Sequence, residues 1–324
     1  MAATQTRAAR LTIAAISDYE PGIEDSLSEE LVVMNVAKAA GIVKTKKRGD
    51  PFDWKVVTDR GAVTAMSADA TSTFTATNPG ISLTLTYRGF KTSDLVHEID
   101  IEVAQGPAQI YDILQNRIFW MPEHVGRAIC TEAYTGDGST DNGFGTNSII
   151  GWNNSIISSG NYGGQSTTTH TAIAGQVLSG GVHGTFSSDP FPSLTTSIIA
   201  CNRGKDAGMG SHWPTHVFMD PTNFGYVLNA ANDIVQTTNY QPNLKYGTQT
   251  VKHMNCEIVM DRFAPANRNY VINMRTQEIH TPFKSLIQTR RKSELSPLSE
   301  AMLCFSYLRW VNKLPRANAR VTTA

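Results

Sequence analysis

The stretch from Asp53 to Val103, DWKVVTDRGAVTAMSADATSTFTATNPGISLTLTYRGFKTSDLVHEIDIEV, carries the clearest secondary-structure signal in the chain. Apolar and polar residues alternate over 81–88, which predicts a β-strand with one buried face. The apolar residues of 54–57 predict a partner strand, and a second alternating run over 95–103 predicts that the pattern continues. The stretch therefore predicts long, extended β-structure in this part of the chain.

The segment between these strands, MSADATSTFTATNPG at 66–80, contains almost no large apolar residues. It predicts a two-stranded ribbon whose tip has no core of its own. An isolated two-stranded hairpin is marginally stable in water, and an open strand edge favours pairing with another chain. We therefore expect the ribbon to rest on another subunit, and the candidate contact residues are Trp54, Phe74, Asn78 and Tyr87.

A second pair of apolar runs lies in CEIVMDRFAPANRNYVINMR, residues 256–275. Cys256–Met260 and Tyr270–Met274 predict two buried strands that form a hairpin, joined by a polar turn. The turn contains no His or Cys that could act with its charged side chains in catalysis. Arg262 and Arg268 are therefore candidate contacts between subunits rather than active-site residues.

Helix signals flank these strands. Ser26 and Glu29 form a capping-box pattern that predicts a helix over 27–40. Gly106-Pro107 opens a helix whose apolar residues repeat at helical spacing to Tyr134, with Pro122 expected to kink or break it. Residues 135–190 are rich in Gly, Ser, Thr and Asn and predict loops. Further predicted elements are a helix over 194–205, a strand over 215–219, a helix over 222–232 capped by Asp220, and an alternating strand over 302–315.

The chain has no net charge that would attract nucleic acid or an acidic membrane surface. The 28 Lys and Arg residues cancel the 28 Asp and Glu residues, and charged residues make up only 17% of the chain. One basic run, Lys44, Lys46, Lys47 and Arg48, predicts a solvated turn, with a contact to nucleic acid as the alternative. The four cysteines are far apart, which predicts free thiols in a reducing compartment. No apolar run reaches transmembrane length, so we expect a protein made and kept in a cytoplasm.

No motif predicts catalysis or metal binding. In His97-Glu98-Ile99-Asp100 the histidine and the two acids point to opposite faces of a strand and do not converge. Asp137 and Asp141 have the spacing of a calcium loop, but that loop's glycine and its last glutamate are replaced by Asn142 and Ser148. The sequence contains no nucleophile elbow, HExxH or phosphate-binding loop. We therefore predict no enzyme activity, no cofactor and no metal.

In their order along the chain, these features resemble the major capsid proteins of tailed bacteriophages, which have the α+β Hong Kong 97-type fold. Besides the ribbon and the helix after Gly106, the resemblance rests on EPGIEDSLSEELVVMNVAKAAGIVK (20–44), AYTGDGSTDNGFGTNSIIGWNNSIISSGNYGG (133–164), THVFMDPTNFGYVL (215–228), residues 256–275 and LRWVNKLPRANARV (308–321). The resemblance implies an N-terminal arm (1–50), an extended β-loop (51–105), the spine helix of a peripheral domain (106–136), an axial domain (137–275) and the C-terminal part of the peripheral domain (276–324).

The resemblance also implies a function. Such subunits assemble into hexamers and pentamers that form the icosahedral head shell around the double-stranded DNA genome. The implied location is the virion, after assembly in the bacterial host cytoplasm and without a membrane. Implied partners are other copies of the chain, a scaffolding protein, a portal protein, an optional decoration protein and packaged DNA, bound without sequence specificity through Lys44–Arg48. No lysine lies between Met66 and Gly80, so we do not expect the covalent cross-links that some members form through this loop.

Two alternatives remain open at the level of sequence. A receptor- or glycan-binding module of a tail fibre or spike would also be rich in Thr, Asn and Gly, but it predicts trimeric β repeats that the sequence lacks. A polysaccharide-cleaving enzyme would require paired carboxylates in a groove. Turnover of a glycan substrate would be the test of that second alternative.

Overall fold

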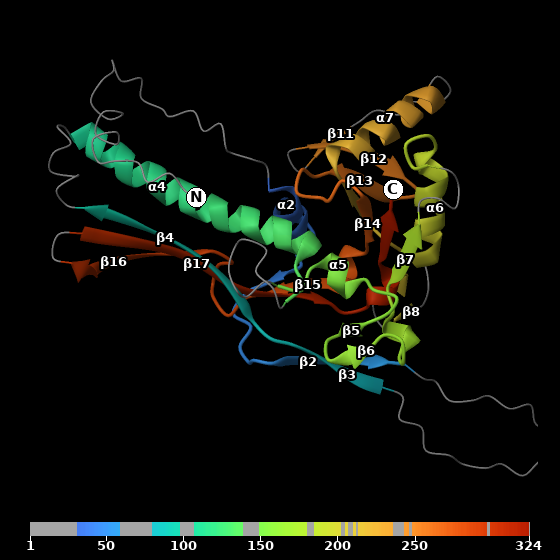
Figure 1. Cartoon of the computed structure of the whole chain (residues 1–324), viewed down its shortest axis with the longest axis horizontal. Helices are drawn as coiled ribbons and strands as arrows, with labels where there is room; N and C mark the ends of the chain where they lie inside the picture. Colours follow the sequence, from blue (N-terminus) through green and yellow to red (C-terminus); the bar gives the residue numbers. More distant parts are fainter. Residues whose placement is uncertain are drawn as a thin grey trace, which may run out of the picture.

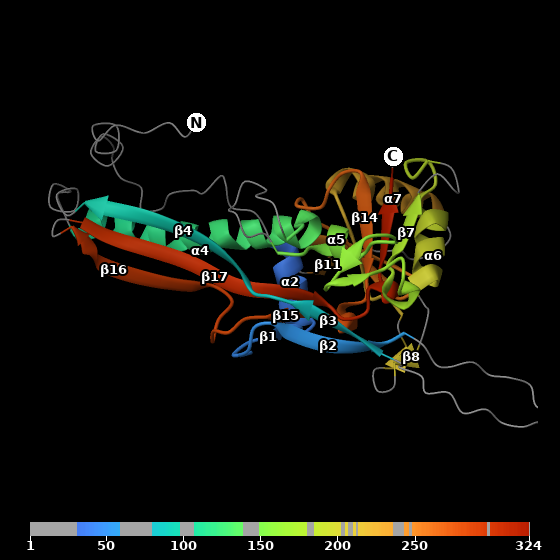
Figure 2. The same ribbon diagram turned by 60° about the horizontal axis from the view of Figure 1, so that its bottom comes forward.

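The computed structural model describes residues 31–58, 80–97, 107–138, 149–179, 185–201, 205–206, 210–211, 213–235, 243–245, 248–296 and 299–323. Figure 1 shows an elongated part, in which a long helix lies along long strands, and a more compact lobe beside it. The turned view in Figure 2 shows the same division, with a two-stranded ribbon running below both parts.

The elongated part is built on β17 (Ser299–Asn312), the longest strand. β17 pairs in antiparallel fashion with β4 (Arg88–His97), β15 (Gln277–His280) and β16 (Gln288–Ser296). β1 (Val43–Lys44) adds to β15 in parallel and completes a five-stranded sheet. The alternating sequence over 302–315 thus predicted this strand, although β17 begins earlier and ends at Asn312.

The pairing of β4 corrects one prediction about the ribbon. The described base of the ribbon consists of β2 (Phe52–Val57) and β3 (Gly80–Leu85), which pair with each other as predicted. β4 leaves this ribbon and pairs with β17 from Arg88↔Leu308 to His97↔Ser299. Residues 95–97 therefore belong to the five-stranded sheet, and 98–103 lie outside the described residues.

Helix α4 (Pro107–Thr135) covers one face of the five-stranded sheet. Met121, Val125 and Ile129 are buried at helical spacing, in one core with Met302 and Leu308 of β17. The helix is continuous through Pro122, so the predicted break does not occur. A proline at this position removes one backbone hydrogen bond, and packing on the sheet compensates for that loss.

Helix α2 (Val32–Ala39) packs in the same core through Val33 and Val36. It begins at Val32, with Leu31 at the N-cap, rather than at the predicted residue 27. Ser26 and Glu29, on which that prediction rested, lie outside the described residues.

The compact lobe contains a seven-stranded sheet in the order β11-β12-β13-β10-β14-β18-β7. Alternating residues of its central strands face two different cores: Val217 and Met219 pack under α6 and α7, whereas Phe218 packs toward α4. Asp220 caps α7, because its carboxylate accepts the amide hydrogens of Thr222 (3.1 Å) and Asn223 (3.3 Å). The elements of the lobe are α6 (Pro190–Cys201), α7 (Pro221–Val235), β7 (Gln176–Ser179), β10 (His216–Met219), β11 (Asn243–Lys245), β12 (Thr248–His253), β13 (Cys256–Met260), β14 (Arg268–Ile272) and β18 (Ala319–Thr322).

The predicted hairpin over 256–275 is wrong in its pairing. β13 and β14 are both strands, but β10 lies between them, parallel to β13 and antiparallel to β14. The turn after β13 therefore passes over the end of β10, where the amide of Asp261 donates to the carbonyl of Met219 at 2.8 Å. A short turn favours a hairpin locally, and here the burial of β10 between two strands overrides that preference.

The remaining described elements are short. They are α5 (Trp152–Ser155), β5 (Asn161–Tyr162), β6 (Gln165–Ser166), β8 (Lys205–Asp206), β9 (Gly210–Ser211) and the 3₁₀ turns η1 (Thr171–Ile173), η2 (Met274–Thr276) and η3 (Pro315–Ala317). The predicted C-terminal segment 276–324 contributes to both sheets, because β18 pairs with β14 and β7. The four cysteines are free, as predicted, and burial raises the pKa of each thiol.

Asn318 is the polar centre of the junction between the two sheets. Its fully buried side chain donates to Asn312 Oδ1 (3.0 Å), Thr276 Oγ1 (3.1 Å) and the Leu314 carbonyl (3.0 Å). Its carboxamide oxygen accepts the amide hydrogen of Asn273 at 2.7 Å. One side chain thus connects the end of β17, the start of β18 and the η2 turn.

We predict that Asn318→Ala lowers the free energy of unfolding by about 1–3 kcal/mol or more, because buried polar groups lose their partner. Urea denaturation of the subunit measures this change. Asn267→Ala is the matched control, since Asn267 is exposed and its recorded hydrogen bond is made by its backbone. Equal stability of the two variants would contradict the structural role of Asn318.

Candidate functional site

The base of the ribbon buries its apolar face against its own chain. Phe52, Trp54 and Val56 of β2 lie on the same face as Ile81, Leu83 and Leu85 of β3, as the register requires. This face packs on Tyr162 and Val311 in a third, separate apolar cluster. The opposite face is open, and Val57 at its end is 63% exposed. The described part of the ribbon is therefore anchored within the subunit, which the sequence did not predict.

The turn Tyr162-Gly163-Gly164 forms the platform under the ribbon. The Tyr162 hydroxyl donates to the carbonyl of Asn312 (3.1 Å) and accepts its amide hydrogen (2.9 Å). Gly163 has φ +58°, and a Cβ there would lie 3.0 Å from the side chain of Leu83. Glycine at this position allows the backbone to approach β3, where the Gly163 carbonyl accepts the amide hydrogen of Thr84 at 3.0 Å.

Trp54 reinforces this platform. Its ring packs edge-on against Tyr162, with 6.1 Å between the ring centroids, and its indole N–H donates to the Lys313 carbonyl at 3.2 Å. The ring is nevertheless partly exposed. The contact of Trp54 with another subunit stays a prediction.

Arg309 of β17 holds the root of the ribbon. Its guanidinium group lies 4.1 Å from the ring centroid of Tyr87 and 4.7 Å from that of Phe52, although the side chain is only 2% exposed. It also donates to the carbonyl of Gly49 at 3.2 Å and lies 3.8 Å from Asp50 Oδ1. One arginine thus holds both chain segments at the root of the ribbon, Phe52 at the start of β2 and Tyr87 just after β3.

Tyr87, predicted as a contact between subunits, takes part in this root. Its hydroxyl donates to the Lys47 carbonyl at 2.7 Å, and its backbone amide donates to Asp50 Oδ1 at 3.1 Å. Burial raises the pKa of Tyr87, although Arg309 acts in the opposite direction. The ring is half-buried, and its contact with a second copy stays a prediction.

A chain of hydrogen bonds continues from Arg309 through His280 to Glu278. Arg309 Nε donates to His280 Nδ1 at 3.2 Å, and His280 Nε2 lies 2.8 Å from Glu278 Oε2. Because arginine can only donate, Nδ1 must be the acceptor and Nε2 must carry the hydrogen. Lys313 Nζ donates to the other carboxylate oxygen of Glu278 at 2.7 Å. The hydrogen bond from His280 and the nearby Lys313 lower the pKa of Glu278 to about 2, against the effect of burial.

The basic run is exposed and has an ordered backbone. Lys46 and Lys47 donate backbone hydrogen bonds to the carbonyls of Phe283 (2.9 Å) and Thr281 (3.0 Å). The side chains of Lys44, Lys46, Lys47 and Arg48 are all exposed. The predicted basic surface is therefore present at the edge of the five-stranded sheet, and its contact with DNA remains a prediction.

The turn after β13 begins with a buried, hydrogen-bonded carboxylate. Asp261 is 1% exposed and accepts hydrogen bonds from the Tyr134 hydroxyl (2.9 Å) and from the amide of Phe263 (2.9 Å). Burial and the neighbouring Asp261 raise the pKa of Tyr134. Arg262 is exposed, whereas Arg268 is partly buried and donates to Asn153. The two arginines therefore differ in exposure, although the sequence predicted both as contacts between subunits.

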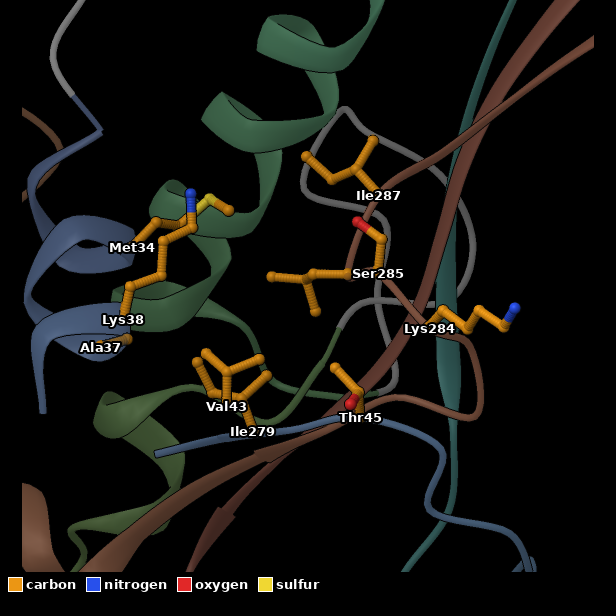
Figure 3. Close-up of a pocket in the computed structure, with 10 residues that line it drawn as sticks. Met34, Ala37, Lys38, Val43, Thr45, Ile279, Lys284, Ser285 and Ile287 are labelled. Atoms are coloured by element: carbon orange, nitrogen blue, oxygen red, sulfur yellow. The ribbon is translucent and has the colours of Figure 1, made fainter. Parts of the chain in front are cut away.

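A pocket of about 330 Å³ lies between α2 and the segment after β15 (Figure 3). Its wall is mainly apolar, from Met34, Val43, Ile279, Leu286 and Ile287, and its polar lining is Lys38, Thr45, Lys284 and Ser285. Figure 3 shows the Lys284 side chain pointing away from the other lining residues. No lining residue is a carboxylate, a histidine or a cysteine, so the pocket has no acid–base pair.

The described residues show no group of three or more His, Cys, Asp or Glu side chains that could hold a metal. Of the residues considered for such a role, Glu98, Asp100 and Asp141 lie outside the described residues. Phe74 and Asn78, the other candidate contacts of the ribbon, also lie outside them. Within the described part of the chain, no helix is long and apolar enough to cross a bilayer.

Solved structures match the chain from end to end. A subunit of the cyanophage A-1(L) capsid superposes with a TM-score of 0.75 at 16% sequence identity, over 97% of this chain and 99% of that one. The capsid of Myoviridae phage XM1 gives a TM-score of 0.62 at 13% identity, over 95% of this chain and 97% of its own. The holo-SrpI encapsulin complex from Synechococcus elongatus PCC 7942 gives 0.59 at 10% identity, over 99% and 96% of the two chains.

The chain has the Hong Kong 97-type capsid fold. No protein-family model matches the sequence, and no curated protein matches it either. The Hong Kong 97-type fold is therefore identified by backbone geometry at sequence identities of 16% and below. This fold confirms the α+β class and the resemblance found in the sequence.

We predict that acid weakens the subunit through Glu278. Because its pKa falls from 4.5 to about 2 on folding, its contribution to stability is complete above about pH 4.5 and is lost as pH falls toward about 2. Glu278→Gln should therefore reduce the loss of stability over this range. The measurement is the free energy of unfolding of both proteins from urea titrations at several pH values between about 5 and 2. Parallel pH profiles would contradict the prediction.

Proposed function

We propose that this chain is the major capsid protein of a tailed bacteriophage. Its copies form hexamers and pentamers, and these build an icosahedral head shell that encloses double-stranded DNA. The correspondence with a cyanophage capsid subunit over 97% of this chain and 99% of that one carries this proposal. The proposal needs no catalytic step.

The ribbon supports a role in assembly. Its base is fixed to the subunit by Trp54, Leu83 and Tyr162, so the direction in which the ribbon leaves the subunit is set before any partner binds. A preorganised element loses less conformational freedom on association than a mobile one. We propose that the ribbon tip, with Phe74 and Asn78, contacts a second copy of the chain.

The proposal keeps the division into arm (1–50), extended loop (51–105), spine helix (106–136), axial domain (137–275) and C-terminal peripheral segment (276–324). Two details refine it: β4 belongs to the peripheral sheet, and β18 belongs to the axial sheet. Scaffolding, portal and decoration proteins are proposed partners in the host cytoplasm and in the virion. The fibre or spike alternative has no support from the comparisons, in which the matched chains form shells.

Shell formation and the enclosure of DNA can be tested separately. Expression of the chain with a scaffolding partner tests the shell, and nuclease-protected DNA of uniform length in particles from infected cells tests genome enclosure. Closed shells that never protect DNA would retain the assembly function and contradict the claim that they enclose a genome.

We predict that deletion of Asp69–Pro79 leaves a folded subunit that does not build shells. The paired base of the ribbon remains, and residues 58–68 still exceed the roughly two to five residues that a hairpin loop requires. Circular dichroism checks folding, and a sizing column with electron microscopy checks assembly. Normal shells from the deletion variant would refute the role of the ribbon tip.

We predict that serine at positions 44, 46, 47 and 48 leaves shells intact and weakens DNA retention. If these side chains contact phosphates, each lost contact should reduce the slope of log retention against log salt by about 0.9. A salt series on filled particles provides the measurement. Serine at Lys91, Arg275, Lys284 and Arg316 is the charge-matched control, and equal slopes for both variants would contradict the prediction.

A further inference from the structure

Two arginines of the axial sheet converge on one side chain of α5. Arg268 of β14 and Arg320 of β18 both donate from Nη1 to the carboxamide oxygen of Asn153 in α5. Arg320 Nη1 also donates to the backbone carbonyl of Asn153 at 2.9 Å. The register pairs Arg320 with Tyr270, so both arginines lie on the face of the sheet that carries the Tyr270 ring.

This pair has no acidic partner among the described residues. The ion pairs recorded there involve His216, His280, Arg309 and Lys313, and neither Arg268 nor Arg320 takes part in them. Their shared partner is a neutral amide. Burial and the charge of Arg268 both lower the pKa of Arg320. Two like charges held together in a partly buried position repel each other unless an anion joins them.

The donor geometry is suited to one small anion. Each guanidinium group carries five N–H donors, and the hydrogen bonds to Asn153 use only Nη1 of each. Arg320 Nε is buried and has no hydrogen-bond partner within the described part of the chain. Both residues are partly exposed as whole residues, so a group from outside would use their other N–H donors rather than the buried Nε. Planar guanidinium forks fit a carboxylate through paired hydrogen bonds.

We propose that Arg268 and Arg320 form a binding site for a carboxylate group of a second copy of this chain. The inference rests on the proposed function and names one contact by which neighbouring subunits recognise each other. Such a contact is heterologous, because the arginine pair of one copy meets an acidic residue elsewhere on the next. A single pair, fixed by one asparagine, suits one carboxylate better than the repeated phosphates of DNA, which are contacted by many exposed cations.

The test compares Arg268→Gln/Arg320→Gln with the control Arg275→Gln/Arg316→Gln, which removes the same charge from positions without a shared partner. We expect the double variant to fold and to require a subunit concentration for shell formation higher by about tenfold or more. Assembly of this variant should also depend less on salt concentration than assembly of the wild type. Light scattering on nuclease-treated, DNA-free subunits measures both effects, and circular dichroism checks folding.

Normal assembly of the double variant would overturn the inference. The proposed function would still stand in that case, as long as the wild-type chain forms shells. Normal empty shells that lose only their DNA would also overturn the inference, because the ligand would then be phosphate. If the glutamine variant does not fold, Arg268→Lys/Arg320→Lys keeps the charge and removes the planar forks. Assembly of that variant at the wild-type concentration would overturn the inference, and a raised concentration would support it. Failure of the wild-type chain to form shells with a scaffolding partner would remove both proposals.

Discussion

The apolar face of the β2–β3 ribbon must be buried, and this requirement connects the separate parts of the subunit. A two-stranded ribbon is too small to bury one face by itself and is marginally stable in isolation. Here Leu83 and Val56 are buried on Tyr162 and on Val311 at the end of β17. The same Tyr162 holds the backbone of Asn312 through its hydroxyl group. The ribbon, the long sheet and the connecting turn therefore depend on one small cluster.

Buried amide side chains then join this cluster to the lobe. Asn312 is bonded to Asn318, which in turn bonds to the η2 turn and the start of β18. Gln277 accepts the indole hydrogens of Trp152 (3.3 Å) and Trp310 (3.0 Å) with one oxygen. Hydrogen bonds between polar groups inside a core favour one arrangement of the elements around them, because another arrangement would break these bonds. We infer that they fix the orientation of the lobe on the elongated sheet, as the proposed role in a shell requires.

Much of this fold could be predicted from local sequence patterns. The features that could not be predicted are strand pairings between residues far apart in the chain. Alternation identified β3, and helical spacing identified α4 through Pro122. The same alternation could not show that β4 pairs with β17, because that pairing joins residues 88–97 to residues 299–308. Likewise, the runs at 256–275 gave two strands but not the intervening β10, since a strand from elsewhere in the chain leaves no local signal.

The residues of the candidate site also fall into those that the sequence revealed and those that it did not. The exposed basic run and the exposed Arg262 were visible as charged residues in polar turns. Arg320 was missed, because its significance arises only where β18 brings it beside Arg268 and Asn153. Arg309 was missed for a similar reason, since an arginine in an alternating strand suggests a solvent-facing position. Its burial between Tyr87 and Phe52 depends on the ribbon crossing that strand.

The central claim is that the subunit is made to be surrounded by copies of itself. Electron microscopy of the purified full-length protein, expressed alone and with a scaffolding partner, tests this claim most directly. The account predicts closed shells, tubes or rings of six or five subunits in at least one of the two preparations. A uniform monomer or trimer in both preparations would contradict it.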